Sequence, residues 1–299
     1  MAVDKHTARW RVVGHSVRGA THERAGVPNQ DAIHWLPESS AGLPLILAVA
    51  DGHGSHKSFR SETGARLAVE TAAQVINDFL LGQAQTESLS VTKRAAEEWL
   101  PAALTRRWLA AVSAHLAAHP LVADELKLAP DIHGTSRSDA PSNPPVVYGT
   151  TILAAAVTTG FIIYLQLGDG EILTVSKEGA VTRPLSKDER LFANETTSLC
   201  SPDAWRDFRV CFQVVSNAPP SLILLCTDGY SNSFHDEQGF LKVGTDILDM
   251  IRADGLEMVN EHLASWLTES TYAGSGDDVT LGLILNQDEE RHASVEHEV

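Results

Sequence analysis

The sequence predicts an α+β fold in which a central antiparallel β-sandwich is flanked by a helix pair on each outer side, giving four αββα layers. The periodic segments run in the order strands, two helices, strands, two helices and a last strand. This order lacks the regular strand–helix alternation of a doubly wound parallel sheet. Residues 44–50 and 221–226 are almost continuously apolar, as expected for strands covered on both faces. Two sheets packed face to face, each with helices outside, provide such cover.

The composition describes a globular chain with an acidic surface. The 299 residues are 43% hydrophobic and carry a formal net charge of −16. The negative charge disfavours binding to nucleic acid or to an anionic membrane, and it is compatible with an acidic pocket that holds cations. Three cysteines without metal-type spacing, no apolar run near ~20 residues and no apolar signal core together indicate a cytoplasmic protein in a reducing compartment.

In the first half of the chain, strands precede a helix pair. Apolar residues recur at helical spacing in both expected helices, and Pro101 is expected to kink or divide the second one. The expected segments are a strand over 8–18, a loop over 19–28, a turn and strand over 29–35, a strand over 44–50, and helices over 59–81 and 92–119.

The second half is rich in strands and ends after a second helix pair. Thr159-Gly160 and Gly168-Asp169-Gly170 have the composition of hairpin turns between consecutive antiparallel strands. The expected strands cover 146–158, 161–167, 171–176, 181–185, 208–215, 221–226 and 279–285, and the expected helices cover 240–251 and 256–266.

We expect one domain over residues 1–286, because the strands on either side of each irregular segment need one another. Residues 129–145 are polar and proline-rich, which favours a loop insertion over a linker. Residues 186–207 are polar and irregular and form a flap candidate. Residues 287–299 form a charged tail.

Four aspartates each stand at the end of an expected strand: Asp51, Asp169, Asp228 and Asp277. Four such ends indicate one acidic centre assembled by the fold. Clustered carboxylates suit hard cations such as Mg²⁺ or Mn²⁺. Two such ions can activate a bridging water and neutralise phosphoryl oxygens, so the centre can hydrolyse a phosphate ester without a covalent intermediate. The absence of a P-loop pattern argues against a nucleotide-driven transferase.

Six short motifs occur in a characteristic order. They are Asn29-Gln30-Asp31, Asp51-Gly52-His53-Gly54, Gly149-Thr150-Thr151, Gly168-Asp169-Gly170, Thr227-Asp228-Gly229 and Asp277-Asp278-Val279-Thr280. Together they resemble the metal-dependent serine/threonine protein phosphatases of type 2C, the PPM family, in a bacterial form. The resemblance spans about residues 10–286, and it implies the same β-sandwich flanked by helix pairs.

The resemblance implies two principal metal positions. Asp51 would bridge both ions, and the Gly52 carbonyl would bind the second. Asp228 and Asp277 would complete the first site. In this interpretation the catalytic residues are Asp51, Asp228 and His53, with His53 as proton donor to the leaving group.

The resemblance also implies weaker positions. Asp31 would act at the second metal mainly through bound water. Asp169, with Asp228, would match the acidic pair that takes a third, weaker ion in bacterial members. Asp278 stands where many members have asparagine, so it ranks below Asp277 as a ligand. Thr150 and Thr151 are expected to form hydrogen bonds within the sheet.

The chain departs from the family pattern at the group that holds the substrate phosphate. The common arginine five positions before the aspartate matched by Asp31 is Gly26 here. Arg24 or His22, on the same segment, are the candidate substrate-binding residues in its place. Gln30 replaces the acidic residue that often precedes Asp31, which is expected to weaken the second metal.

The interpretation that follows is a phosphatase acting on phosphoserine and phosphothreonine in proteins phosphorylated by a serine/threonine kinase. One alternative is a catalytically weak metal- or phosphate-sensing module of the same fold, which Gly26 favours. Another is a small-molecule phosphatase that uses the same metals. Retention of the four aspartates favours an active enzyme, since crowded carboxylates repel one another unless cations hold them.

Overall fold

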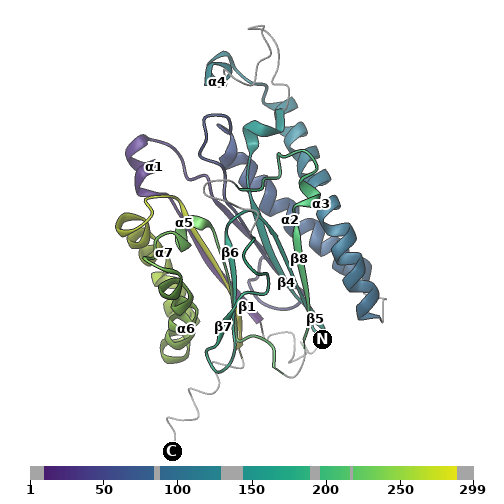
Figure 1. Cartoon of the computed structure of the whole chain (residues 1–299), viewed down its shortest axis with the longest axis vertical. Coiled ribbons are helices and arrows are strands. Elements are labelled where there is room, and N and C mark those ends of the chain that lie inside the picture. The colour runs from purple at the N-terminus through teal and green to yellow at the C-terminus, as the bar shows by residue number, and fades with distance from the viewer. Residues whose placement is uncertain (1–9, 84–87, 129–143, 189–195, 216–217, 288–299) are drawn as a thin grey trace, which may run out of the picture.

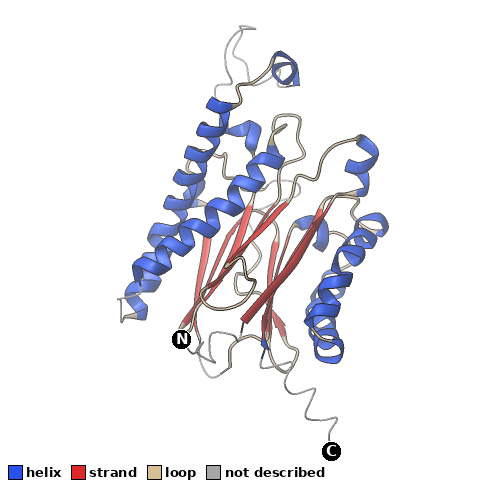
Figure 2. Cartoon of the chain, turned by 180° about the vertical axis from the view of Figure 1, so that it is seen from behind, coloured by secondary structure: helices blue, strands red, loops and turns tan. Residues whose placement is uncertain are grey.

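Two five-stranded antiparallel sheets pack face to face between two pairs of long helices in the computed structural model (Figures 1 and 2). The structure describes residues 10–83, 88–128, 144–188, 196–215 and 218–287. The predicted four-layer αββα architecture is therefore confirmed. The described residues include no helix long and apolar enough to cross a membrane.

Every strand pairing within the sheets is antiparallel. In spatial order, one sheet contains β1 (Trp10–Val17), β10 (Val279–Asn286), β9 (Leu222–Cys226), β6 (Glu171–Val175) and β7 (Val181–Thr182). The other contains β2 (Ala32–Leu36), β3 (Leu45–Ala50), β4 (Ile152–Val157), β5 (Phe161–Leu167) and β8 (Arg209–Val214).

Each sheet has its own helix pair on the outside. The helices are α2 (Ser61–Gln83) and α3 (Leu89–Ala118) over the β3 sheet, and α6 (Glu237–Asp254) and α7 (Leu256–Ala273) over the β10 sheet. Shorter helices are α1 (Ala20–Ala25), α4 (Ala123–Leu128), α5 (Asp228–Ser231) and the 3₁₀ turns η3 (Pro144–Tyr148) and η4 (Ala204–Arg206). Pro101 lies inside α3 without dividing it.

The position of strand β3 between the helix pair and the other sheet explains why its sequence is apolar at every position. Ile46, Ala48 and Ala50 pack in the cluster that joins the sheet to α2 and α3. Leu45, Leu47 and Val49 pack in the cluster between the two sheets. All six residues are fully buried. A strand with both faces covered gains burial energy from each successive side chain, which is why alternation is lost.

The turn Gly168-Asp169-Gly170 is not a hairpin, which corrects the sequence-based prediction. It joins β5 in one sheet to β6 in the other, so the chain crosses the sandwich there. The side-chain amide of Gln166 donates hydrogen bonds to the Gly168 and Gly170 carbonyls, at 3.4 and 2.7 Å. Gly168 has a φ of 112° and packs against Thr151, a conformation that favours glycine. The residue types of a turn indicate that the chain bends there, but they do not indicate in which sheet the next strand lies.

Two further segments differ from expectation. Residues 20–25, expected to lie in a loop, form helix α1. The strand expected from residue 146 begins at Ile152, because residues 144–148 form a 3₁₀ turn. The predicted insertion and tail fall almost entirely on 129–143 and 288–299, outside the described residues. Of the flap candidate, 189–195 also lie outside them, whereas residues 196–207 are described and include the 3₁₀ turn η4. The domain bounds stay a prediction.

Two glycines of α2 offer a matched test of packing. A Cβ on Gly64 would lie 1.9 Å from the Tyr148 carbonyl oxygen, whereas a Cβ on Gly82 would meet nothing within 4 Å. Gly64→Ala should therefore lower the free energy of unfolding by at least about 2 kcal/mol through overpacking. Gly82→Ala should raise it by up to about 1 kcal/mol, because alanine favours the helix. Chemical denaturation of both variants checks this, and equal effects would contradict the described packing of α2 on η3.

Candidate metal centre

The predicted acidic residues converge on one cavity. Asp51, Asp169, Asp228 and Asp277 all line a cavity of about 1340 Å³, and His53 lies at the same wall. Carboxylate oxygens of Asp51, Asp169 and Asp228 lie within 4.8 Å of one another. These aspartates come from loops that follow strands in different sheets, so only the folded sandwich brings them together.

Asp51 is held in place through its backbone. Its amide donates a hydrogen bond to the Thr151 hydroxyl at 3.0 Å, and its carbonyl accepts from the Thr150 hydroxyl and the Thr151 amide, each at 2.8 Å. Both threonines are fully buried, and their expected role as hydrogen-bonding residues within the sheet is confirmed. With its backbone fixed from both sides, Asp51 projects from a rigid strand end.

Asp31 lies close enough to Asp51 for the two carboxyls to repel each other, and two hydroxyls hold it in place. Thr227 and Thr280 each donate a hydrogen bond to Asp31 Oδ2, at 2.7 and 2.8 Å. Thr227 immediately precedes Asp228, and Thr280 follows Asp277-Asp278 in the chain. Asp31 thus ties together three of the six motifs. The two threonines were not predicted as site residues, although both belong to the motifs that contain the predicted aspartates.

Burial and mutual repulsion raise the pKa of three carboxyls in this group. Burial is the main cause for Asp31 and Asp51, and neighbouring aspartates raise both further. Burial likewise raises the pKa of Asp228. Among the described residues, no lysine or arginine forms an ion pair with Asp51, Asp169 or Asp228. Oxygen donors that are crowded, partly buried and without a cationic partner fit a hard divalent cation.

Gly52 lies where the backbone passes very close to the Gln30 and Ser61 carbonyls. Its amide donates to the Gln30 carbonyl at 3.1 Å, and a Cβ there would lie 2.5 Å from that oxygen and 2.8 Å from the Ser61 carbonyl oxygen. Only glycine fits this position. The predicted role of the Gly52 carbonyl as a metal ligand stays a prediction.

His53 follows Gly52 on the same loop, which places it beside the carboxylates. Its amide donates to the Gly149 carbonyl at 3.0 Å, and its ring packs on Gly149, where a Cβ would come within 2.6 Å of the ring. Burial lowers the pKa of His53, and the charge of Asp169 opposes this effect. Asp169 itself accepts a hydrogen bond from the Thr196 hydroxyl at 3.0 Å.

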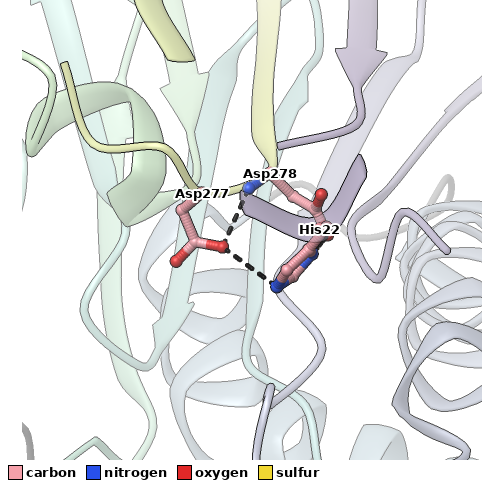
Figure 3. A group of neighbouring side chains, drawn as sticks. All are labelled: His22, Asp277 and Asp278. Atoms are coloured by element: carbon pink, nitrogen blue, oxygen red, sulfur yellow. Dashed lines mark hydrogen bonds and ion pairs between the residues drawn. The ribbon is translucent and has the colours of Figure 1, made fainter. Parts of the chain in front are cut away.

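The two adjacent aspartates before β10 have different surroundings. The Asp277 side chain is 52% exposed and lines the cavity. Asp278 is 3% exposed, and its oxygens accept hydrogen bonds from the Gly19 and Gln30 amides, both at 2.6 Å. This difference agrees with ranking Asp277 above Asp278 as a ligand. His22 lies between the two carboxylates (Figure 3).

The candidate phosphate-binding residues lie on α1. Gly26 caps the C-terminus of this helix with a φ of 71°, so the position of the family's common arginine serves here as a left-handed helix cap. Arg24 is exposed and is not among the residues that line the cavity. The lysine and arginine that do line it, among the described residues, are Lys187 and Arg209. Sequence reasoning missed both, because they lie in irregular or edge segments without a motif.

A fold of two sheets between helix pairs, with this acidic cavity at the strand ends, defines a metal-dependent phosphatase of the type that the motifs resemble. The family model described as protein phosphatase 2C matches residues 18–268. The chain therefore belongs to the protein phosphatase 2C family, and it is a metal-dependent serine/threonine phosphatase. A comparison with curated protein sequences finds no match.

Solved bacterial structures share the fold. PppA, "a key regulatory component of T6SS in Pseudomonas aeruginosa", matches with 18% identity and a TM-score of 0.55, covering 93% of this chain and 98% of that chain. The Mycobacterium tuberculosis serine/threonine phosphatase PstP/Ppp matches with 18% identity and a TM-score of 0.51, covering 92% and 98%. The catalytic domain of PstP in complex with two manganese ions matches with 20% identity and a TM-score of 0.50, covering 92% and 97%.

The raised carboxyl pKa values predict how metal binding depends on pH. The folded, metal-free protein retains protons on Asp31 and Asp51 that the unfolded chain loses, so its stability falls as pH rises through the raised pKa values. A bound cation replaces those protons. The increase in Tm caused by saturating Mn²⁺ should therefore be larger at pH 7.5 than at pH 5.5, as measured by differential scanning fluorimetry. The increase should nearly vanish in Asp51→Asn, and an increase that does not change with pH would contradict the assignment.

Proposed function

We propose that this phosphatase hydrolyses phosphoserine and phosphothreonine in proteins at a centre of two divalent cations, Mg²⁺ or Mn²⁺. The observation that carries the proposal is the convergence of Asp51, Asp169, Asp228 and Asp277 on one cavity. A regulatory module without turnover is not favoured, because the chain keeps the four aspartates at the strand ends and supports Asp31 with two buried hydroxyls.

The proposed ligands divide between the two cations. Asp51 would help to hold both, and Asp228 and Asp277 would complete the first set of ligands. The Gly52 carbonyl would belong to the second set, where Asp31 would act mainly through bound water. The fixed backbone of Asp51 and the two hydroxyls on Asp31 support this division, since a preorganised ligand set loses little entropy on binding.

Asp169 is the proposed ligand of a third, weaker cation, shared with Asp228. Its carboxylate lies within 4.8 Å of the other two carboxylates of the cluster. Asp169 also stands on the turn that crosses between the sheets, and the Thr196 hydroxyl is its partner. A ligand set of two side chains binds less tightly than one of three or more, so this site should empty first as the metal concentration falls.

Bound cations would supply the charge that stabilises phosphoryl oxygens and favours ionisation of water. The chain supplies orientation and proton transfer. His53 lies at the cavity wall beside the carboxylates, where its ring can donate a proton to the leaving serine or threonine oxygen. Burial lowers its pKa, which makes the protonated ring a stronger acid and also reduces the fraction of the ring that is protonated. Asp228, at the start of α5, lines the same cavity and would help to hold the first cation.

The substrates are phosphoproteins, and we expect a serine/threonine kinase to supply them. Arg24 is the proposed substrate-binding residue on α1. His22, the other candidate from the sequence, lies against Asp277 and Asp278 instead. None of the three cysteines forms a disulfide in the described part of the chain, and the cytoplasmic location stays a prediction.

Hydrolysis of a phosphothreonine peptide, with and without metal, tests the proposed function. Protein stripped with a chelator should lose turnover, and Mn²⁺ or Mg²⁺ should restore it. Asp51→Asn should lower kcat by roughly a thousandfold, equivalent to about 4 kcal/mol of lost transition-state stabilisation. Asp124→Asn, on the distant helix α4, serves as the control and should retain wild-type turnover. Equal turnover in chelator and in metal would contradict the proposed mechanism.

Arg24 permits a separate test of substrate binding. Because guanidinium can pair two phosphate oxygens, Arg24→Ala should raise KM for the phosphothreonine peptide about tenfold, near ~1.4 kcal/mol, with little change in kcat. Arg106→Ala, an exposed arginine on the far helix α3, is the matched control. If both variants have the wild-type KM, Arg24 does not bind the substrate.

A further inference from the structure

His22 is the only histidine whose ring nitrogens lie between two of the acidic motif residues, among the residues that the structure describes. Its Nδ1 lies 2.8 Å from Asp278 Oδ2, and its Nε2 lies 3.7 Å from Asp277 Oδ1. The His22 side chain is 18% exposed, so the ring is held largely inside the protein. Figure 3 shows the ring with one nitrogen directed towards the Asp277 carboxylate.

Asp278 orients this ring and is itself fixed. Both of its oxygens accept backbone hydrogen bonds, from Gly19 and Gln30, so the carboxylate cannot rotate freely. It approaches His22 Nδ1 obliquely, as a close polar contact without ideal hydrogen-bond geometry. A carboxylate on one ring nitrogen is the arrangement by which proteins orient a histidine whose other nitrogen binds a metal.

The spacing of His22 and Asp277 suits a shared cation. A separation of 3.7 Å between Nε2 and Oδ1 is too long for a direct hydrogen bond. Two donor atoms that each lie about 2.1 Å from one ion are roughly 3–4 Å apart. Only one Asp277 oxygen faces His22, and the other points away from the ring (Figure 3).

Gln30 provides an independent observation at the same place. Gln30 is 8% exposed, and its side-chain oxygen Oε1 is buried with no hydrogen-bond partner. A buried acceptor without a partner costs about 1–3 kcal/mol, so such an atom calls for a ligand. If Gly54 carried a Cβ, that one atom would lie 3.6 Å from Gln30 Oε1 and 4.0 Å from His22 Nε2. Both atoms therefore border one point beside Gly54.

We propose that the cation bound by Asp277 takes a nitrogen ligand from His22 Nε2 and an oxygen ligand from Gln30 Oε1. An imidazole ligand favours a divalent transition-metal ion over Mg²⁺, whose preferred ligands are oxygens. The inference rests on the proposed use of cations by the acidic cavity, and it adds the identity of the ligands and the class of metal. It also gives His22 and Gln30, which depart from the common family pattern, one joint role.

Electron spin echo spectroscopy with substoichiometric Mn²⁺ as the probe, in the absence of phosphate, tests the ligand directly. The wild type should show ¹⁴N coupling from a histidine nitrogen. The coupling should disappear in His22→Gln and persist in His56→Gln, an exposed histidine on the loop after Asp51. It should also persist in His53→Gln, which excludes the other histidine that lines the cavity as the source of the coupling. Coupling that is absent in the wild type, or lost only with His53, would overturn the proposal.

Metal competition provides the second measurement. Titration calorimetry should show that His22→Gln reduces the preference for Mn²⁺ over Mg²⁺ at least tenfold. Gln30→Met, which keeps the buried volume, should weaken Mn²⁺ binding while the ¹⁴N coupling remains. An unchanged preference in His22→Gln would overturn the assignment even in a fully active phosphatase. Failure of the proposed function itself would instead appear as turnover that does not depend on metal.

Discussion

The crowding of carboxylates at the junction of two sheets is the constraint on which the rest of this structure depends. Burial and repulsion both work against ionised Asp31 and Asp51, as their raised pKa values show. The protein opposes these costs with fixed hydroxyl donors, from Thr227 and Thr280, and with a backbone held by the Gly149-Thr150-Thr151 segment. A bound divalent cation would complete the balance by neutralising these carboxylates.

The residues of this site that could be predicted from the sequence are those that belong to short local motifs. A fully apolar strand followed by Asp51-Gly52 identifies both the buried strand β3 and the carboxylate at its end, because burial on two faces removes alternation. The same logic located Asp169, Asp228 and Asp277. The four-layer fold followed from the order of such segments, since each sheet needs a helix pair to cover its outer face.

The parts that the sequence did not predict depend on which distant segments meet. Nothing local shows that the chain changes sheets at Gly168–Gly170, because a hairpin and a crossover can have the same turn residues. Helix α1 is only six residues long, too short for a periodic signal, and its cap at Gly26 explains the missing arginine only after the backbone is seen. The contact between His22 and Asp278 joins residues 256 positions apart, which no spacing rule reaches.

Strand β10 lies in the interior of its sheet, between β1 and β9, although it comes last among the described strands. It pairs with β1 on one side and β9 on the other, and Asp277, Asp278 and Thr280 arrive with it. During synthesis, a chain that ends before β10 has two open strand edges and an Asp31 without one of its hydroxyl donors. Such a chain cannot assemble the acidic centre. Metal capture and catalysis therefore begin only when nearly the whole domain has left the ribosome, and until then the open edges expose the chain to mispairing.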